Sequence, residues 1–255
     1  MNHQNYASVF TGVNSAPRTH GLDYFGECRP ARDSGGDFHD FTVMAPSGLA
    51  VSVGDVSADG LGTGILMSGL RALLRSLAAH GPDEIGRLVR DLNRAAWQAS
   101  SGDFHMTLFH ACLDPVRRQL EYVSAGHEPA LLIRRRTGRV HRLESTGTVI
   151  GLSDRTVYGH RTVPLEPGDL LIAHTDGVTD AANAEGIGFG EKGILRAVER
   201  HREARACDLA KEILEAADRH AGAGQQDDRT VVVVRFQAAA WKTVDEDRQE
   251  AVMAA

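Results

Sequence analysis

Hydrophobic and polar residues alternate over two neighbouring stretches in the first quarter of the chain, 38–44 and 49–53. A period of two is typical of a half-buried β-strand. The residues between the stretches are Pro-Ser-Gly at 46–48, which favour a tight turn. The pattern therefore predicts a β-hairpin that begins at Phe38.

The hydrophobic spacing then changes to three and four residues, which is typical of helices that bury one face. Leucines recur at this spacing over 61–80, and a second such stretch covers 85–101. Between them stand Gly81 and Pro82. Glycine favours a helix end and proline a helix start, so we expect two consecutive helices.

Short apolar stretches separated by proline, glycine and aspartate follow, and a second pair of helical patterns comes after them. We expect the first four stretches to form an antiparallel meander and the next two to add further strands. The predicted strands cover 104–113, 120–124, 130–134, 139–143, 157–163 and 169–174. The predicted helices cover 190–201 and 206–220, and a valine-rich strand closes the series at 230–236.

Strands thus occur in runs and helices in pairs, without the strict alternation of a parallel α/β sheet. This order predicts an α+β fold, in which antiparallel sheets pack together and helix pairs lie outside them. We expect a loose lead-in at 1–19, one domain at 20–236 and a charged, alanine-rich tail at 237–255. A chain of 255 residues is long enough to bury a sizeable core.

The composition narrows the class of protein. Lys and Arg number 28 against 34 Asp and Glu, a net charge of −6, which is unusual for a nucleic-acid binder. No apolar run approaches the ~18 residues of a membrane span, and no leader peptide is evident. The three cysteines are far apart in sequence. We therefore expect a cytoplasmic protein with no disulfide framework, no membrane and no nucleic-acid partner.

Aspartates recur where predicted strands begin or end. Asp37, Asp55 and Asp176 each adjoin glycine, and Asp227 and Asp228 directly precede the last strand. An aspartate at a strand end is often only a turn residue. If these ends converge, each carboxylate pair at ~4 Å repels by on the order of 4 kcal/mol at an effective dielectric near 20. Oxygen ligands without His or Cys select Mg²⁺ or Mn²⁺, and two such ions can activate a water for phosphoryl transfer.

The neighbouring glycines add a second argument for ions. A residue without a side chain lets the main chain come close to a bound ion, so that a carbonyl oxygen can become a ligand. The carbonyl of Val56, next to Asp55, is the candidate.

At these residues the chain resembles the metal-dependent serine/threonine protein phosphatases of the PPM (type 2C) class, and in particular their SpoIIE-like bacterial branch. The matching stretches keep the order of the family and extend from about residue 20 to 236. They are Gly-Gly-Asp-Phe-His-Asp-Phe at 35–41, Gly-Asp-Val-Ser at 54–57, Leu-Glu-Tyr-Val-Ser-Ala-Gly-His-Glu-Pro-Ala-Leu-Leu at 120–132, Gly-Thr-Val-Ile-Gly-Leu at 147–152, His-Thr-Asp-Gly-Val-Thr-Asp at 174–180, Phe-Gly at 189–190 and Gln-Asp-Asp-Arg-Thr-Val at 226–231.

The resemblance implies a four-layer α-β-β-α sandwich with a two-metal centre between the sheets. It implies Asp37, Asp55 and Asp176 as ligands of Mn²⁺ or Mg²⁺ that also carry catalysis, with the Val56 carbonyl as a further ligand. In the last motif it places the ligand at Asp227, with Asp228 as the alternative. The implied activity is hydrolysis of phosphoserine or phosphothreonine on a bacterial regulatory protein, such as an anti-sigma factor antagonist, in signal transduction.

Three positions near the implied site are candidates for substrate contact. Where the family usually has Gly-His/Lys-Gly, this chain has Ala58, Asp59 and Gly60, so Asp59 would add negative charge or a metal contact. His39 replaces an aromatic residue between two aspartates. Arg32 lies close to the place of a phosphate-gripping arginine but is out of register with it.

Four other features have two readings each. His127 is either a general acid or a turn histidine that bonds a neighbouring loop, and His174 either orients a ligand or is a buried strand histidine. Cys112 lies in an apolar strand with no adjacent base, which favours a core residue over a nucleophile. The basic run 134–136 is either a solvated hairpin loop or a docking patch for an acidic partner.

Two other functions are compatible with the sequence. The first is a non-catalytic binding module on the same fold, which the acid at 59 favours. The second is a metal-dependent hydrolase of small phosphoesters. No sensor domain is evident, so control would come from a separate activator, from homodimerisation through the helices, or from the tail at 237–255.

Overall fold

A computed structural model describes residues 19, 21–31, 36–45, 47–56, 61–79, 85–100, 104–222 and 227–237. The first five strands and two helices are β1 (Leu22–Arg29), β2 (Phe38–Met44), β3 (Gly48–Val56), α2 (Leu61–Ala79), α3 (Ile85–Ser100), β4 (Met106–Asp114) and β5 (Gln119–Ala125). The remaining elements are β6 (Ala130–Ile133), β7 (Val140–Leu143), β8 (Arg161–Pro164), β9 (Leu170–His174), α4 (Asp176–Thr179), α5 (Gly190–Arg200), α6 (Ala206–Ala221) and β10 (Arg229–Phe236).

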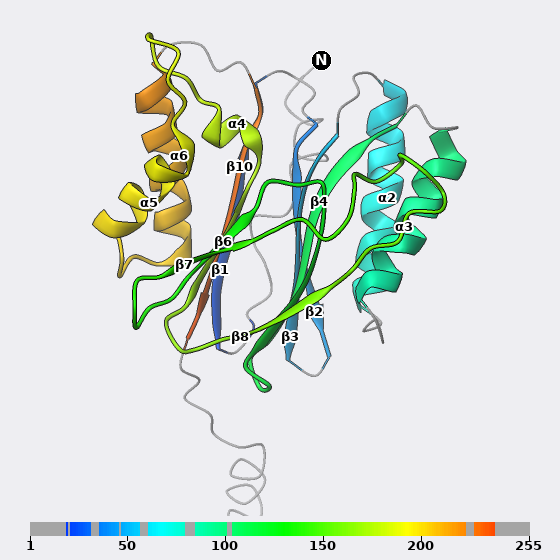
Figure 1. The fold of residues 1–255 in the computed structure, drawn as a ribbon, viewed down its shortest axis with the longest axis horizontal. Coiled ribbons are helices and arrows are strands. Elements are labelled where there is room, and N and C mark those ends of the chain that lie inside the picture. The colour runs from blue at the N-terminus through cyan, green and yellow to red at the C-terminus, as the bar shows by residue number, and fades with distance from the viewer. Residues whose placement is uncertain are drawn as a thin grey trace, which may run out of the picture.

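The strands form two five-stranded sheets in which every neighbouring pair is antiparallel. One sheet has the order β1-β10-β9-β6-β7, and the other has the order β2-β3-β4-β5-β8. Helices α5 and α6 cover the outer face of the first sheet, and α2 and α3 cover the outer face of the second (Figure 1). The predicted α-β-β-α sandwich is thus the observed architecture.

Three buried apolar clusters hold the four layers together. The central cluster lies between the sheets, with residues such as Val51, Phe109 and Val232 from both inner faces. A second lies between the β2-containing sheet and α2 and α3, and a third between the β10-containing sheet and α5 and α6. Strand β10 contributes alternate valines to the first and third clusters, as the period of two requires.

Two predictions about the strands were wrong. Strand β1 was missed: Leu22–Arg29 pairs with β10 along its whole length. The predicted meander does not exist either, because β5 pairs with β4 and β8, whereas β6 lies in the other sheet between β7 and β9. The short segment from Gly126 to Pro129 therefore carries the chain from one sheet to the other.

Several predictions concern residues outside those that the structure describes. These are Arg32, Asp59, most of the lead-in at 1–19 and all but the first residue of the tail at 237–255. The proposed division into lead-in, domain and tail therefore stays a prediction. In the described part of the chain, no helix is both long enough and apolar enough to cross a membrane.

Candidate metal centre

The candidate carboxylates gather where the two sheets meet at one end of the sandwich. In the β2–β3 hairpin, Phe38 pairs with Gly54, so Asp37 and Asp55 flank the open end of the hairpin. In the other sheet, Val231 pairs with His174, which brings Asp176 to the same end as the residues before β10. The antiparallel pairing thus places acids from four separate segments at the same end of the two sheets.

A hydrogen bond between the sheets fixes Asp37. The Oγ1 hydroxyl of Thr175 donates to Oδ2 of Asp37 at 2.7 Å, and accepts from the backbone N–H of Thr230 at 3.0 Å. Asp37 is 3% exposed and Thr175 is fully buried. Thr175 was not predicted as a site residue, although it stands next to Asp176 in a matching motif. Its hydroxyl holds the carboxylate of one sheet against the strand ends of the other.

The two adjacent aspartates before β10 have different surroundings. Asp228 is buried, and its two carboxylate oxygens accept hydrogen bonds from the backbone N–H groups of Ala31 at 2.8 Å and Asp37 at 3.3 Å. Asp227 is exposed, and its Oδ1 accepts from the N–H of Asp228 at 2.9 Å. Asp228 therefore organises the backbone around Asp37, whereas Asp227 faces the open side of the site.

Two glycines allow the main chain to approach the acids closely. A side chain on Gly36 would place its Cβ 2.5 Å from the carbonyl oxygen of Val56 and 2.7 Å from Oδ1 of Asp55. A side chain on Gly177 would meet the carbonyl oxygen of Asp228 at 2.0 Å. Gly36 thus lets the main chain lie close to two oxygen atoms that the sequence analysis predicts as metal ligands.

The carboxylates raise one another's pKa values. Burial is the largest cause of the raised pKa of Asp55, about 6, and the charges of Asp176, Asp227 and Asp228 add to it. Burial also raises the pKa of Asp176, with Asp227 as the next cause. For Asp37 burial raises the pKa well above its usual value, against the hydrogen bonds from Thr175. Burial and mutual repulsion thus disfavour the ionised carboxylates, and a bound cation would favour them.

The donor set fits a hard divalent cation. Carboxylate oxygens and a backbone carbonyl oxygen are the ligands that Mg²⁺ and Mn²⁺ prefer. The backbone at Gly36 lies close to two of these oxygens. Among the residues that the structure describes, no group of three or more His, Cys, Asp or Glu side chains is arranged to hold a metal ion. The individual ligands therefore stay a prediction.

An arginine cluster supports the loop that carries Asp176. The buried Arg229 donates from Nε to the carbonyl oxygen of Gly177 at 3.2 Å, and its Nη1 pairs with Oδ1 of Asp218 in α6. Arg29 of β1 pairs with the other oxygen of Asp218 at 2.6 Å. This cluster was not predicted, because its members lie in three separate segments.

The histidines near the site are buried. His39 is 0% exposed, lies with its ring against Gly26, and has a pKa lowered to about 4, mainly by burial. This placement argues against the expected contact of His39 with a substrate. His127 bonds the hydroxyl of Thr107 through Nδ1 at 2.8 Å, and His174 bonds the carbonyl of Thr175 at 3.2 Å. Both agree with the structural readings of these residues.

Cys112 has the surroundings of a core residue. Burial is the largest cause of its raised pKa, about 12, so the thiol is not a ready nucleophile.

Comparison with known proteins identifies the family to which the chain is similar. Residues 45–237 match the family model described as stage II sporulation protein E, SpoIIE. The chain is 30% identical over 234 residues to protein IcfG of Synechocystis sp., an alignment that covers 80% of this chain and 36% of IcfG. It is 27% identical over 221 residues to phosphoserine phosphatase RsbU of Bacillus subtilis, covering 86% of this chain and 64% of RsbU. The chain therefore spans less than two thirds of each relative.

Solved structures share the fold. The structure of the RsbU and RsbW domains of Rv1364c from Mycobacterium tuberculosis superimposes with a TM-score of 0.75 at 23% identity, covering 93% of this chain and 69% of that one. The catalytic domain of the serine/threonine phosphatase PstP, solved with two manganese ions, gives a TM-score of 0.65 at 17% identity and covers 85% and 99%. The fold predicted from the sequence is thereby confirmed.

Proposed function

We propose that this chain, which belongs to the SpoIIE family, is a metal-dependent phosphatase that hydrolyses phosphoserine or phosphothreonine on a regulatory protein. Membership of this family was predicted from the motifs and is confirmed. The observation that carries the proposal is the convergence of Asp37, Asp55, Asp176 and Asp227 from both sheets on one end of the sandwich. The charges of Asp176, Asp227 and Asp228 act on Asp55, so acids that are distant in sequence lie close together in the fold.

The proposed cofactors are two Mn²⁺ or Mg²⁺ ions. Asp37, Asp55, Asp176 and Asp227 would hold them with their carboxylates, and Val56 with its carbonyl oxygen. Two bound divalent ions lower the pKa of a water between them and stabilise the charge of an in-line displacement at phosphorus. The structure of PstP with manganese supports this choice of metal.

The chain's own residues would keep the ligands in place. Thr175 holds Oδ2 of Asp37 through its hydroxyl, and Gly36 lets the backbone lie close to Asp55 and Val56. Asp228 acts as a positioning residue, since each of its oxygens accepts a backbone N–H, and it stays the alternative ligand to Asp227. The site residues therefore fall into two sets. One set would bind the metal, and the other keeps those ligands in position.

The proposed substrate is a small phosphorylated protein of a sigma-factor regulatory system, such as an anti-sigma factor antagonist. The similarity to RsbU, which is named a phosphoserine phosphatase, supports this class of substrate. The structure of Rv1364c, in which an RsbU domain and an RsbW domain were solved together, supports a role beside a regulatory partner. A separate activator or a homodimer would then control the activity.

The experiment compares hydrolysis of a phosphoserine peptide and of p-nitrophenyl phosphate, each with Mn²⁺ and with EDTA. We expect turnover that needs Mn²⁺ and that falls by about 10²-fold or more in Asp176→Asn, because a lost ligand removes charge stabilisation in the transition state. Asp154→Asn is the matched control, since Asp154 is an exposed acid in a distant loop.

Three outcomes would contradict the proposal. Turnover unaffected by EDTA would exclude metal dependence. Turnover of the small ester alone would favour a phosphoester hydrolase. Absence of both turnover and Mn²⁺ binding in a folded protein would favour a non-catalytic binding module on this fold.

A further inference from the structure

A cavity opens on the outer face of the β10-containing sheet, at the end opposite the carboxylates. Its volume is about 290 Å³, and its floor is apolar, formed by residues of β6, β7, β9 and α5. These residues are Ile133, Val140, Leu170, Leu195 and Val198. Three of them also pack at the margin of the buried cluster beneath α5, so the cavity continues a core that α5 leaves uncovered there.

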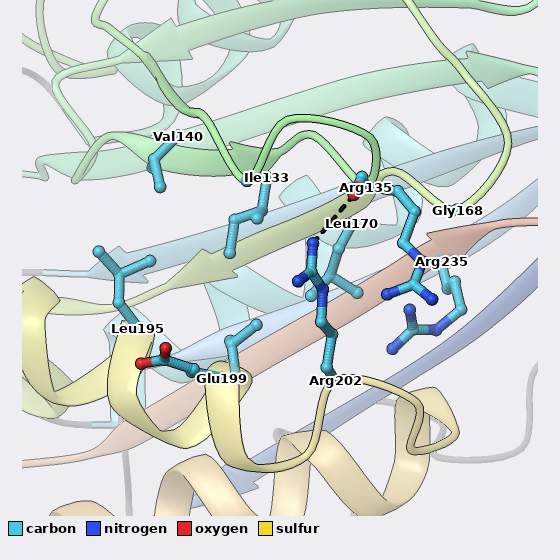
Figure 2. Close-up of a pocket in the computed structure, with 11 residues that line it drawn as sticks. Ile133, Arg135, Val140, Gly168, Leu170, Leu195, Glu199, Arg202 and Arg235 are labelled. Atoms are coloured by element: carbon cyan, nitrogen blue, oxygen red, sulfur yellow. Dashed lines mark hydrogen bonds between the residues drawn. The ribbon is translucent and has the colours of Figure 1, made fainter.

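Three arginines from separate segments gather on one side of this cavity (Figure 2). Arg135 follows β6, Arg202 follows α5, and Arg235 lies near the end of β10. Arg202 Nη2 donates to the carbonyl oxygen of Arg135 at 2.9 Å, and Arg235 Nη2 donates to that of Ala204 at 3.0 Å. Both bonds go to neutral carbonyl groups, so neither neutralises a guanidinium charge.

The charge of this cluster is only partly balanced. Arg135 pairs with Glu203 at 2.5 Å, and Glu199 is the acid among the lining residues. The Nε of Arg235 is buried and has no hydrogen-bond partner among the described residues. Burial lowers the pKa of Arg235, whereas the charges of Asp23 and Glu203 raise it and that of Arg135 lowers it. A buried donor without a partner costs about 1–3 kcal/mol, so an acceptor at this place would be favourable.

The described chain ends beside the cavity. Gln237 directly follows Phe236, whose carbonyl accepts from the N–H of Gly168, a lining residue. The next residues are Ala-Ala-Ala-Trp-Lys-Thr-Val-Asp-Glu-Asp at 238–247. An aromatic residue is thus followed, after three others, by three consecutive acids. This order combines an apolar residue with acids of the charge opposite to that of the arginines.

We propose that the tail folds back onto this cavity, with Trp241 on the apolar floor and the acids 245–247 against Arg135, Arg202 and Arg235. The reach is sufficient, because the six residues from 235 to 241 span up to ~20 Å when extended. The cavity lies just below the ~300–1,000 Å³ of small-molecule sites, which favours one large side chain over a free ligand. Tryptophan over a guanidinium also gains cation–π attraction.

The test follows Trp241 by fluorescence in a Trp97→Phe background, where it is the remaining tryptophan. In the full chain we expect blue-shifted emission and protection from acrylamide. A chain ending at Gln237 should bind a synthetic 238–255 peptide in the same assay. Arg202→Glu should weaken that binding about tenfold or more, the effect of losing about 1.4 kcal/mol.

Arg196→Glu is the matched control, because Arg196 is an exposed residue of α5 that does not line the cavity. A peptide with lysines at 245–247 should regain affinity for Arg202→Glu and lose it for the parent chain. Circular dichroism verifies that each variant is folded. None of these measurements needs metal or turnover, so they succeed or fail independently of the proposed phosphatase activity.

Each of three results would overturn the proposal. If Arg202→Glu and Arg196→Glu bind the peptide with equal affinity, the arginines that line the cavity do not take part in binding. Trp241 of the intact chain could be fully quenched by acrylamide while an unrelated acidic peptide binds. The ligand of the cavity would then be an external acidic partner. Protection of Trp241 that rises with protein concentration would assign it to the tail of a second copy.

Discussion

The hydroxyl of Thr175 donates a 2.7 Å hydrogen bond to Oδ2 of Asp37, a residue 138 positions earlier in the chain and in the other sheet. Replacement of Thr175 by valine keeps the shape and removes the donor. We expect Thr175→Val to lose about 1–2 kcal/mol of unfolding free energy, because the buried Asp37 carboxyl loses a partner. Urea unfolding in EDTA measures this loss. Thr175→Ser should keep most of the stability, and equal losses in both variants would show that the bond contributes little.

Gly36 should tolerate no side chain at all. In Gly36→Ala the new Cβ would lie 2.5 Å from the carbonyl oxygen of Val56 and 2.7 Å from Oδ1 of Asp55. We therefore expect Mn²⁺ affinity, measured by calorimetry, to fall at least tenfold, about 1.4 kcal/mol. Gly69→Ala is the control, since a Cβ there meets nothing within 4 Å and alanine favours a helix. Unchanged Mn²⁺ binding in Gly36→Ala would exclude this pair of oxygens as ligands.

Asp227 and Asp228 should separate metal binding from stability. Asp228→Ala leaves the buried N–H of Asp37 and the partly buried N–H of Ala31 without this acceptor, so we expect a loss of about 1–3 kcal/mol in the metal-free protein. Asp227→Ala should unfold almost as the parent does, because Asp227 is exposed, and should lose Mn²⁺ binding. Urea unfolding measures the stability of each variant, and calorimetry measures its Mn²⁺ binding. The reverse pattern would make Asp228 the ligand.

Arg229 should stabilise the loop that follows β9. Arg229→Met removes the donor to the carbonyl oxygen of Gly177 and one of the two arginines on Asp218. We expect a loss of about 1–3 kcal/mol, because the carbonyl oxygen of Gly177 loses a buried donor, whereas Asp218 is 40% exposed and still pairs with Arg29. Arg219→Met is the comparison, since Arg219 is 59% exposed and its pairs should contribute under ~1 kcal/mol. Similar melting temperatures for the two variants would contradict this account.

His110 should make stability depend on pH. It is fully buried in β4, bonds the hydroxyl of Ser52 at 2.9 Å, and has a pKa lowered by burial to about 4. The unfolded chain takes up a proton near pH 6.5, whereas the folded protein resists it until about pH 4. Stability is therefore complete above pH 6.5 and falls as the pH drops towards 4, by up to about 3 kcal/mol for this group.

Urea unfolding at pH 7.5 and pH 5 measures this loss. His110→Gln has no proton to take up, so its stability should change less between the two pH values than that of the parent. An equal change in both proteins would assign the pH dependence to other groups.

Much of the fold was predictable because periodicity reports which face of an element is buried. It does not report which sheet a strand joins. Strands β5 and β6 are separated by only four residues, yet they lie in different sheets. Strand β5 pairs with β8 in one sheet, and β6 pairs with β9 in the other. Strand β1 was missed for a related reason. Most of its residues are only partly buried, so its sequence, Leu-Asp-Tyr-Phe-Gly-Glu-Cys-Arg, has no clear alternation.

The candidate site shows the same limit. The acids were found because aspartate is rare beside strands, and the glycines around them supported the prediction. The residues that hold the acids act across long separations in sequence. Asp228 reaches the backbone of Ala31 197 positions away, and Arg229 contacts both α4 and α6. The choice between Asp227 and Asp228 depends on such contacts, which adjacent positions in a motif cannot distinguish.

The pairing of β1 with β10 also sets the order in which this protein is completed during synthesis. Of the described strands, β1 at residues 22–29 is made before all the others, and it pairs with β10 at residues 229–236, which is made after them. Until then β1 has no hydrogen-bonded neighbour and β9 lacks one of its two. A nascent chain would expose these strand edges until β10 is made, and exposed strand edges make a chain prone to aggregate. Asp227 directly precedes β10, so a nascent chain lacks part of the set of acids until β10 is about to be made.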